Sequence, residues 1–439
     1  MAAMDNASPK KELTLFDSTC LIVGIIIGAG IYQTAPDIAK GVSHAWGVMA
    51  IWIAGGVLSL CGALGYAELA SAYPREGGDY VYLSRAYGRW AGFLFGWIQL
   101  VIVRPGDIAI MAFAFATYAR TLFDPFSSSE ISYTQILYAS LAAIVFTGIN
   151  MIGVKEGKWT QNLLTSAKAL GLLAIVGVAI LSPRAVPLEN ASFDFPLSVS
   201  LILVLFTYGG WNEMAYVAAE VKNPQKNIVR ALVLGTVSVT ALYLLANGAF
   251  LYTLGYSGMV NSEAVATDTV ATVFPHWGSR IISVLICISA LGAVNGLVFT
   301  GARITYAVGS EHRALSLLGK WNEKTGTPLR ALFVQGLIAV TLIILLGSFM
   351  RTILYYAASV YLFYLATTIS VMVLRWKEPH IPRPYKVTGY PFTTLLFAGT
   401  CIFLIYKALL YDVQGAITSM GIVLLGLPVY WITSKTPLK

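Results

Sequence analysis

Charged residues are scarce in this chain. They make up 11% of its 439 residues, where soluble domains have about 25%, and hydrophobic residues make up 57%. A soluble core does not account for so much apolar sequence, so the composition predicts an all-helical, polytopic membrane protein. Cysteine is scarce too. Because all four cysteines (Cys20, Cys61, Cys287 and Cys401) lie in apolar segments, neither a disulfide framework nor a metal site is expected.

Motifs of catalysis are absent from the sequence as well. There is no P-loop, nucleophile elbow, dinucleotide fingerprint or metal motif, so no enzyme, cofactor, metal or ATP-driven pump is expected. The net charge of +8 does not indicate nucleic acid, because the basic residues are scattered among the loops. Residues 1–13 are polar and no small-residue cleavage site follows the first apolar segment, so no signal peptide is expected.

Twelve apolar segments divide the chain, each near the roughly 20 residues that cross a bilayer. They are predicted at 15–40, 47–70, 89–119, 133–152, 159–182, 197–220, 230–254, 279–308, 329–347, 352–374, 391–411 and 415–433. Basic residues alternate with these spans. Twenty of the 29 lie on the side of the N-terminus, four on the other side and five within spans. By the positive-inside rule, both termini are predicted to be cytoplasmic in the plasma (inner) membrane.

The first span has a glycine-rich centre. Gly24, Gly28 and Gly30 fall within the apolar stretch Leu21–Tyr32, and Pro36 follows. Two interpretations are open. Gly24 and Gly28 fit a small-xxx-small seam for close helix packing. Alternatively, the helix is discontinuous and its broken centre binds a ligand, since unpaired backbone at membrane depth survives only inside protein or along a cavity.

A second interruption, Phe206–Asn212 with Gly209 and Gly210 at its centre, lies five spans later. An odd offset gives the two spans opposite orientations, as an inverted five-plus-five repeat requires, and paired broken segments favour a transporter site. Freed amides around Gly28, Ala29 and Gly30 would hold a carboxylate. Freed carbonyls around Phe206 and Tyr208 would accept from an ammonium. An α-amino acid is the simplest ligand with that pattern.

Several polar residues lie within predicted spans. Lys168 either snorkels or supplies a fixed positive charge beside the first break. Glu213 either faces the cavity, with proton coupling as one role, or pairs with a basic residue. Pro105 is expected to kink the third span, where Arg104 and Asp107 are spaced to pair with each other.

Three further residues have two interpretations each. Asn295 in the eighth span either faces the site or packs between helices. Glu68 and Glu220, near the cytoplasmic ends of spans, either form an inner gate with loop Arg or Lys or are simply interfacial.

Several motifs together resemble the L-type branch of the amino acid–polyamine–organocation superfamily. They are GIIIGAGIY, WIQLVIVRPGDIAI, INMIGVKEG, FTYGGWN, AVNGLVFTGARITYAVGSE and RPYKV, in the family's order along nearly the whole chain. The resemblance implies a single transporter domain of twelve helices. Its first inverted repeat would be 15–182 and its second 197–374, with two further helices in 391–433. It also implies sodium-independent amino acid transport, typically by exchange.

The resemblance assigns roles to particular positions. Gly28, Ala29 and Gly30 would hold the carboxylate, and backbone near Ile26 and at Phe206 and Gly209 the amine. Phe206 would close the site, Asn212 would order the unwound segment, and Lys168 would take the sodium position. Taking both broken segments together, the candidate substrate-binding residues are Ile26, Gly28, Ala29, Gly30, Phe206, Thr207, Tyr208, Gly209, Asn212 and Asn295. Lys168 is the candidate cation surrogate, and Glu213 is a candidate for proton coupling.

The sequence also departs from the family's pattern. Ala29 replaces a serine, Thr207 an alanine and Leu297 a serine, and Glu213 stands where eukaryotic members have an aromatic residue. The 120–132 loop has no cysteine, so no disulfide-linked heavy chain is expected and the chain would work alone, as prokaryotic members do. The alternatives to exchange are a proton-coupled symporter and an amine or polyamine antiporter. No recurring polar stripe favours a channel, and two broken helices are not needed by an accessory protein or receptor.

Overall fold

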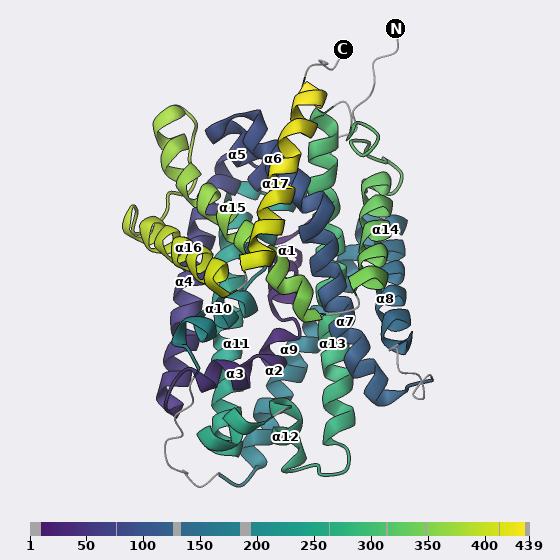
Figure 1. The fold of residues 1–439 in the computed structure, drawn as a ribbon, viewed down its shortest axis with the longest axis vertical. Helices are drawn as coiled ribbons and strands as arrows, with labels where there is room; N and C mark the ends of the chain where they lie inside the picture. Colours follow the sequence, from purple (N-terminus) through teal and green to yellow (C-terminus); the bar gives the residue numbers. More distant parts are fainter. Residues whose placement is uncertain are drawn as a thin grey trace.

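The structure is a computed structural model that describes residues 10–75, 77–125, 133–184, 195–262, 264–312, 315–346, 349–411 and 413–434. Within these ranges the chain is helical and forms no strand. Most of its long helices run side by side along the long axis of the molecule, with α16 (Phe392–Tyr411) inclined across them (Figure 1). α17 (Val413–Ser434), the last helix, ends at the upper end of the bundle in this view.

Helices fall where the apolar segments predict them. In the first half they are α1 (Leu15–Ile26), α2 (Gly30–Gln33), α3 (Ala35–Lys40), α4 (Ala45–Ala72), α5 (Asp79–Tyr87), α6 (Arg89–Ile98), the π-helical turn η1 (Gln99–Val103), α7 (Arg104–Leu122), α8 (Tyr133–Ile152) and α9 (Val154–Leu181). In the second half they are α10 (Leu197–Thr207), the 3₁₀ helix η2 (Trp211–Glu220), α11 (Pro224–Asn261), α12 (Val265–Ala271), α13 (Gly278–Glu311), α14 (Leu329–Leu346), α15 (Phe349–Lys377), α16 (Phe392–Tyr411) and α17 (Val413–Ser434).

Nine helical stretches in the described chain are long and apolar enough to cross a membrane, and two shorter apolar helices cover Leu329–Leu345 and Ile417–Ile432. Each coincides with a predicted span. The sixth predicted span is divided between α10 and η2, neither of which crosses a bilayer by itself. The count of twelve spans therefore stays a prediction. Two short helices, α5 and α12, lie in connections where none was predicted.

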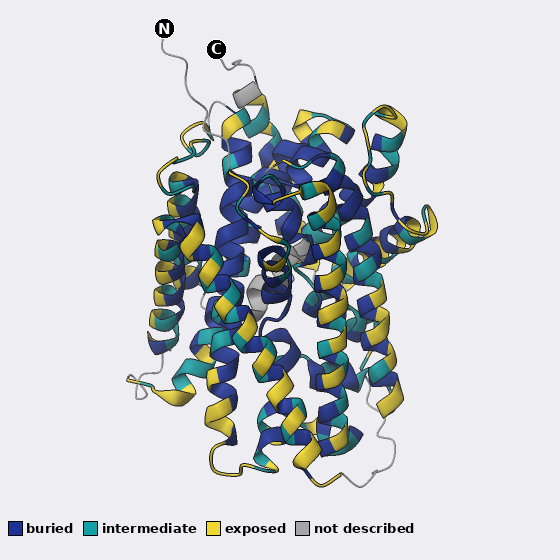
Figure 2. Cartoon of the chain, turned by 180° about the vertical axis from the view of Figure 1, so that it is seen from behind, coloured by how far each residue is buried: buried dark blue, intermediate teal, exposed yellow. Residues whose placement is uncertain are grey.

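Burial separates central helices from peripheral ones (Figure 2). The most apolar window of the α1–α2 segment and that of α13 are 78% buried, whereas those of α9 and α16 are 28% buried. The broken first span therefore runs through the middle of the protein. The outer helices expose aliphatic and aromatic side chains, as expected where lipid replaces water as the solvent.

Two groups of helices pack around α11 and α7, and α9 contacts members of both. In the first group, α11 packs on α1, α4 and η2. In the second, α7 packs on α8, α13 and α14. η2 and α1 also touch α13, so both broken spans lie at the boundary between the groups.

The third span is irregular beside Pro105, where the sequence predicts a kink. Pro105 is the second residue of α7, which continues directly from the preceding turn. The irregularity precedes it, as the π-helical turn η1. Since a π-helical turn contains one extra residue, it changes the direction in which Arg104 projects.

Candidate functional site

The first break begins directly after Ile26. Ile27 has φ −73° and ψ 77°, the geometry of an inverse γ-turn, and the Gly28 amide donates to the Ile26 carbonyl at 2.7 Å. The chain becomes helical again only at Gly30, in the four residues of α2. No backbone carbonyl of the described residues accepts from the amides of Ala29, Gly30 or Ile31, as expected at a helix start. The sequence predicts the amides around Gly28, Ala29 and Gly30 as donors for a carboxylate. Those of Ala29 and Gly30 have no backbone acceptor among the described residues, whereas that of Gly28 is used by the γ-turn.

The glycines of this span allow close contacts with different parts of the protein. A Cβ atom on Gly24 would lie 2.1 Å from Thr165 Oγ1 on α9, so Gly24 permits close helix packing. A Cβ atom on Gly30 would lie 3.2 Å from the Thr207 side chain at the end of α10. Gly30 thus lets the first break approach the second.

The second break contains a glycine that the backbone requires. Gly210 has φ 111°, in the left-handed region that other residues rarely adopt. It joins α10, which ends at Thr207, to η2, which begins at Trp211. A Cβ atom there would lie 2.7 Å from Ile25 Cγ2, in the last turn of α1. The two breaks, far apart in the sequence, are therefore in direct contact.

Tyr243 joins the two breaks. Its hydroxyl lies 2.8 Å from the carbonyl oxygen of Ile26 and 3.2 Å from that of Thr207, the last residues of α1 and α10. Its side chain is fully buried on α11. Sequence reasoning missed this residue, because Tyr243 lies in an apolar stretch where nothing distinguishes it from a packing aromatic.

Lys168 lies beside the first break and does not snorkel, because its side chain has 0% exposure. Its ammonium donates to the carbonyls of Gly24 at 2.6 Å, Ile27 at 2.7 Å and Ser289 at 2.8 Å. Three donors thus meet three acceptors, and the charge lies among the final carbonyls of α1. The Ser289 hydroxyl also donates to Ile27, at 2.9 Å. α1 ends against α9 and α13.

Glu213 pairs with a basic residue, the second of its two predicted roles. Its Oε1 lies 2.7 Å from Arg104 of α7, and its Oε2 accepts from the Thr300 hydroxyl at 2.6 Å. Both charged side chains are 4% exposed. Arg104 also donates to Gln99 at 2.9 Å. The ion pair links η2 to the second group of helices.

Asn295 packs between helices rather than facing the breaks. Its amide nitrogen donates to the Gly157 carbonyl at 3.1 Å and to Gln161 at 2.9 Å, and its oxygen accepts from Asn150 at 2.9 Å. All of these partners lie on α8 and α9. Asn295 therefore connects α13 to those helices.

The other predicted residues lie around the second break. Phe206 is partly exposed, and its carbonyl accepts from Gly209 at 2.9 Å. The Tyr208 hydroxyl donates to the Trp52 carbonyl at 3.0 Å, which commits that side chain to α4. Thr207 Oγ1 lies 3.0 Å from Thr34 Oγ1, joining α10 to the residue between α2 and α3. Asn212 lies at the start of η2, with its amide hydrogen-bonded to tyrosines.

Ion pairs also connect the end of η2 and the end of α4 to neighbouring helices. Glu220, at the end of η2, receives two hydrogen bonds from Arg303, at 2.7 and 3.1 Å, with both side chains buried. The Leu13 amide donates to the Glu220 carbonyl at 2.8 Å, so the N-terminal segment lies against η2. Glu68, on α4, accepts from Arg375 at 2.8 Å and forms an ion pair with Arg383 at 3.4 Å. Both glutamates therefore have arginine partners, as an inner gate would need.

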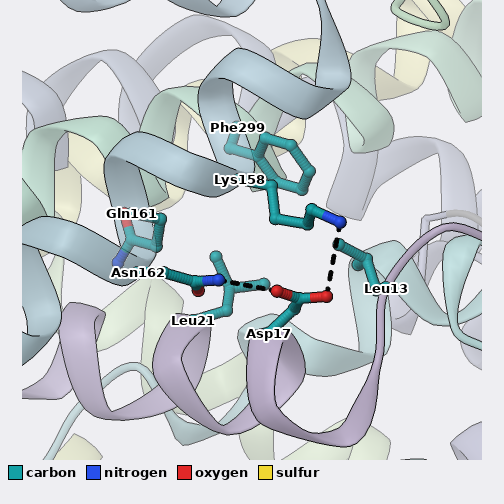
Figure 3. A pocket seen from close by; sticks show the side chains of 7 residues that line it. All are labelled: Leu13, Asp17, Leu21, Lys158, Gln161, Asn162 and Phe299. Carbon is teal, nitrogen blue, oxygen red and sulfur yellow. Dashed lines mark hydrogen bonds and ion pairs between the residues drawn. The ribbon is translucent and has the colours of Figure 1, made fainter.

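Figure 3 shows how the first turn of α1 is attached to α9. The Asp17 carboxylate accepts from Asn162 at 2.6 Å and lies 3.4 Å from the ammonium of Lys158. Asp17 also completes a capping box with Thr14, which explains why the helix begins at Leu15. The cavity beside these side chains has a volume of about 10 Å³, room for a water molecule but not for an amino acid.

Known proteins match nearly the whole chain. The amino acid permease family matches residues 13–433. The rat large neutral amino acids transporter small subunit 2 (Rattus norvegicus) is 33% identical over 96% of this chain and 80% of its own length. The b(0,+)-type amino acid transporter 1 of mouse (Mus musculus) is 31% identical over 88% of this chain and 80% of its own length. This chain therefore belongs to the amino acid permease family of the amino acid–polyamine–organocation superfamily, as a multi-pass membrane transporter and not an enzyme.

Proposed function

We propose that this chain carries α-amino acids across the plasma membrane by alternating access, with the substrate held between the two helix breaks. The observation that carries the proposal is their direct contact, at Gly210 against Ile25 and at Gly30 against Thr207. Amino acids are also what the relatives are named for transporting. Helix ends that meet inside a membrane protein offer polar backbone where side-chain charge would be costly.

The substrate's two charged groups find complementary partners at these ends. The amides of Ala29, Gly30 and Ile31, at the start of α2, suit a carboxylate. The Phe206 carbonyl and the turn at Gly209, with the backbone near Ile26 beside them, suit an ammonium. Because Ala29 lacks the hydroxyl of the family's serine, backbone amides carry more of the carboxylate recognition here.

Transport is proposed to be independent of sodium, because Lys168 already supplies a cation at the end of α1. Its ammonium lies within 2.6–2.8 Å of three carbonyl oxygens. A bound sodium ion would coordinate oxygens of this kind, and a fixed ammonium leaves no need for one.

The finer architecture is part of the proposal. Twelve spans would form an inverted repeat, 15–182 and 197–374, followed by two helices in 391–433, with both termini in the cytoplasm. The chain would work without a disulfide-linked heavy chain. The 120–132 loop contains no cysteine, although part of that loop lies outside the described residues.

Exchange is proposed over proton symport and over amine or polyamine antiport. The amine hypothesis depended on Glu213 as an acidic group free to meet a cationic substrate. Its pairing with Arg104 at 2.7 Å removes that freedom. A strong dependence of flux on the pH gradient that is lost in Glu213→Gln would instead favour the symporter.

Uptake into proteoliposomes tests the proposal directly. The purified chain is reconstituted with and without internal amino acid and given a panel of labelled amino acids, in sodium or choline buffer. Uptake should need internal amino acid and be equal in both buffers. Uptake that requires sodium would overturn the role of Lys168, and no uptake of any amino acid would overturn the function.

A further inference from the structure

A chain of buried hydrogen bonds reaches the second break from outside it. It begins at Asp79, the first residue of α5, whose side chain is fully buried. Asp79 Oδ1 accepts from the hydroxyls of Tyr66 on α4 and Thr367 on α15, and Oδ2 accepts from Tyr216 on η2 at 2.8 Å. A carboxylate that only accepts hydrogen bonds satisfies three hydroxyl donors at once.

The Asp79 carboxylate determines which group donates in each hydrogen bond of this series. A tyrosine hydroxyl has one hydrogen, and that of Tyr216 is committed to Asp79. Its oxygen must therefore accept, and it does so from the amide nitrogen of Asn212 at 2.8 Å. The amide oxygen of Asn212 then faces the Tyr364 hydroxyl, which donates to it at 3.1 Å.

Asn212, at the other end of this series of hydrogen bonds, fixes the start of η2. Asn212 is the second residue of that helix and follows Gly210, where φ is 111°. The rings of Tyr66 and Tyr364 also pack on Trp211, with centroids 5.1 and 5.8 Å away. The same tyrosines thus hold the first two residues after the break.

We propose that Asp79 is a positioning residue for the substrate site: through Tyr216 it sets which way the Asn212 amide points and so holds the backbone that leaves the second break. This inference rests on the proposed function, since it assumes that the break binds substrate. Asp79 itself needs no contact with substrate, because its effect passes through two hydrogen bonds.

The decisive test moves the carboxylate from one end of the hydrogen-bond series, position 79, to the other end, position 212. In Asp79→Asn, the new amide oxygen accepts from Tyr66 and Thr367, so the new amide nitrogen faces Tyr216. The Tyr216 hydroxyl must then donate toward Asn212, and the Asn212 side-chain amide has to flip to accept that hydrogen. In Asn212→Asp, two carboxylates compete for the single hydrogen of Tyr216. Each single variant should bind amino acid about tenfold more weakly, the effect of one misplaced buried hydrogen bond.

The double variant Asp79→Asn with Asn212→Asp satisfies every group again. Tyr216 and Tyr364 then donate to the new carboxylate at position 212, and the new amide at position 79 donates to Tyr216. Affinity should return to within about threefold of the parent chain, since no buried polar group is left unpaired. A double variant that binds amino acid no more tightly than the weaker-binding single variant would overturn the proposal, because a purely steric role gives losses of affinity that add.

The measurement is equilibrium binding of tritiated alanine, leucine, serine and arginine to the purified chain, with melting temperatures alongside. Thr367→Val is the matched control. It removes a donor from the other oxygen of Asp79, so it should lower the melting temperature but change affinity less than about twofold. An equal loss of affinity in Thr367→Val would show general destabilisation and overturn the proposal.

A second cycle does not change Asn212. Tyr216→Phe should weaken binding as much as Asp79→Asn, and combining the two should add little further loss; additive losses would contradict the route through Tyr216. If the parent chain binds no amino acid, the proposed function fails. The melting temperatures of the same variants then decide the hydrogen-bond chain separately, with non-additive changes supporting it and additive changes overturning it.

Discussion

At the scale of single residues, backbone carbonyls at the breaks are held by two side chains with different chemistry. Lys168 gives three hydrogen bonds as a cation, and Tyr243 lies within reach of two carbonyls as a neutral hydroxyl. The intramembrane lysine was conspicuous in the sequence and its neighbourhood could be predicted. The tyrosine was not conspicuous, because an apolar helix with an aromatic residue has many packing explanations.

Replacing Lys168 by methionine should reduce amino acid flux at least tenfold. The change leaves the carbonyls of Gly24, Ile27 and Ser289 without their charged donor, and losing a hydrogen bond to a charged group costs about 1.5–3 kcal/mol. Flux into proteoliposomes is the measurement. Lys407→Met, on α16 with its ammonium over the rings of Phe403 and Tyr406, is the matched control and should transport normally. Unaltered flux in Lys168→Met would rule out the cation-surrogate role.

Replacing Tyr243 by phenylalanine should weaken amino acid binding about fivefold, since it removes one hydroxyl whose net contribution is about 1 kcal/mol. The ring stays, so its packing on Trp52 at 5.3 Å is kept. Tyr256→Phe, on the same helix but bonded to the Ala39 carbonyl at 3.1 Å, is the control for losing a buried hydroxyl. If both variants bind equally well, the hydroxyl of Tyr243 has no part in the site.

At the scale of helices, each broken span ends where a particular backbone geometry ends it. An inverse γ-turn at Ile27 stops α1, and a left-handed Gly210 follows the end of α10. Glycine-rich stretches made both interruptions predictable, as did the apolar runs for the long helices. The π-helical turn η1 and the short helices α5 and α12 were not predictable, because they depend on tertiary packing and not on a hydrophobic period.

Introducing valine at Gly30 should abolish transport while the chain still inserts and folds. A Cβ atom there already lies 3.2 Å from Thr207, and overpacking costs about 1–3 kcal/mol at the point where the breaks meet. Gly177→Val on α9 is the control, because no atom lies within 4 Å of its Cβ position. Uptake assays with matched expression distinguish them. Normal uptake by Gly30→Val would place the substrate elsewhere.

Breaking the buried pair at the end of η2 should destabilise the protein strongly. Glu220→Gln leaves Arg303 buried without its carboxylate, a cost of about 3–5 kcal/mol, and replacing both residues by methionine should recover most of it. The partly exposed pair Asp37–Lys40 is the control, and Asp37→Asn should cost less than about 1 kcal/mol. Melting temperatures in detergent measure both. Equal values for the two single variants would contradict this account.

At the scale of the whole molecule, the two broken spans lie where two groups of helices meet. Pairs between η2 and the second group, Arg104–Glu213 and Arg303–Glu220, cross that boundary. A transporter that rocks one group of helices against the other must move the two side chains of each such ion pair relative to each other. A charged side chain at the boundary between the groups has a definite partner in one arrangement of the helices. This favours discrete conformations over gradual deformation.

The orientation of the chain can be tested by labelling cysteines, since the four native cysteines are buried. Ser279→Cys, at the exposed start of α13, should react with a membrane-impermeant maleimide in intact cells. Lys324→Cys, in an exposed loop at the other end of α13, should react only after permeabilisation. The positive-inside rule gives this expectation, and the opposite labelling pattern would reverse the topology.

The sequence by itself determined the class of protein, the positions of its long helices, the two breaks and the family, because hydrophobic runs, glycines and motifs are local properties of a chain. Only the tertiary structure decided the partners. Glu213 pairs with Arg104, Asn295 packs between helices, and Tyr243 and Asp79 support the breaks from other spans. Partners could not be predicted because a buried polar group is satisfied by whichever residue the fold brings within about 3 Å, however far away it lies in the chain.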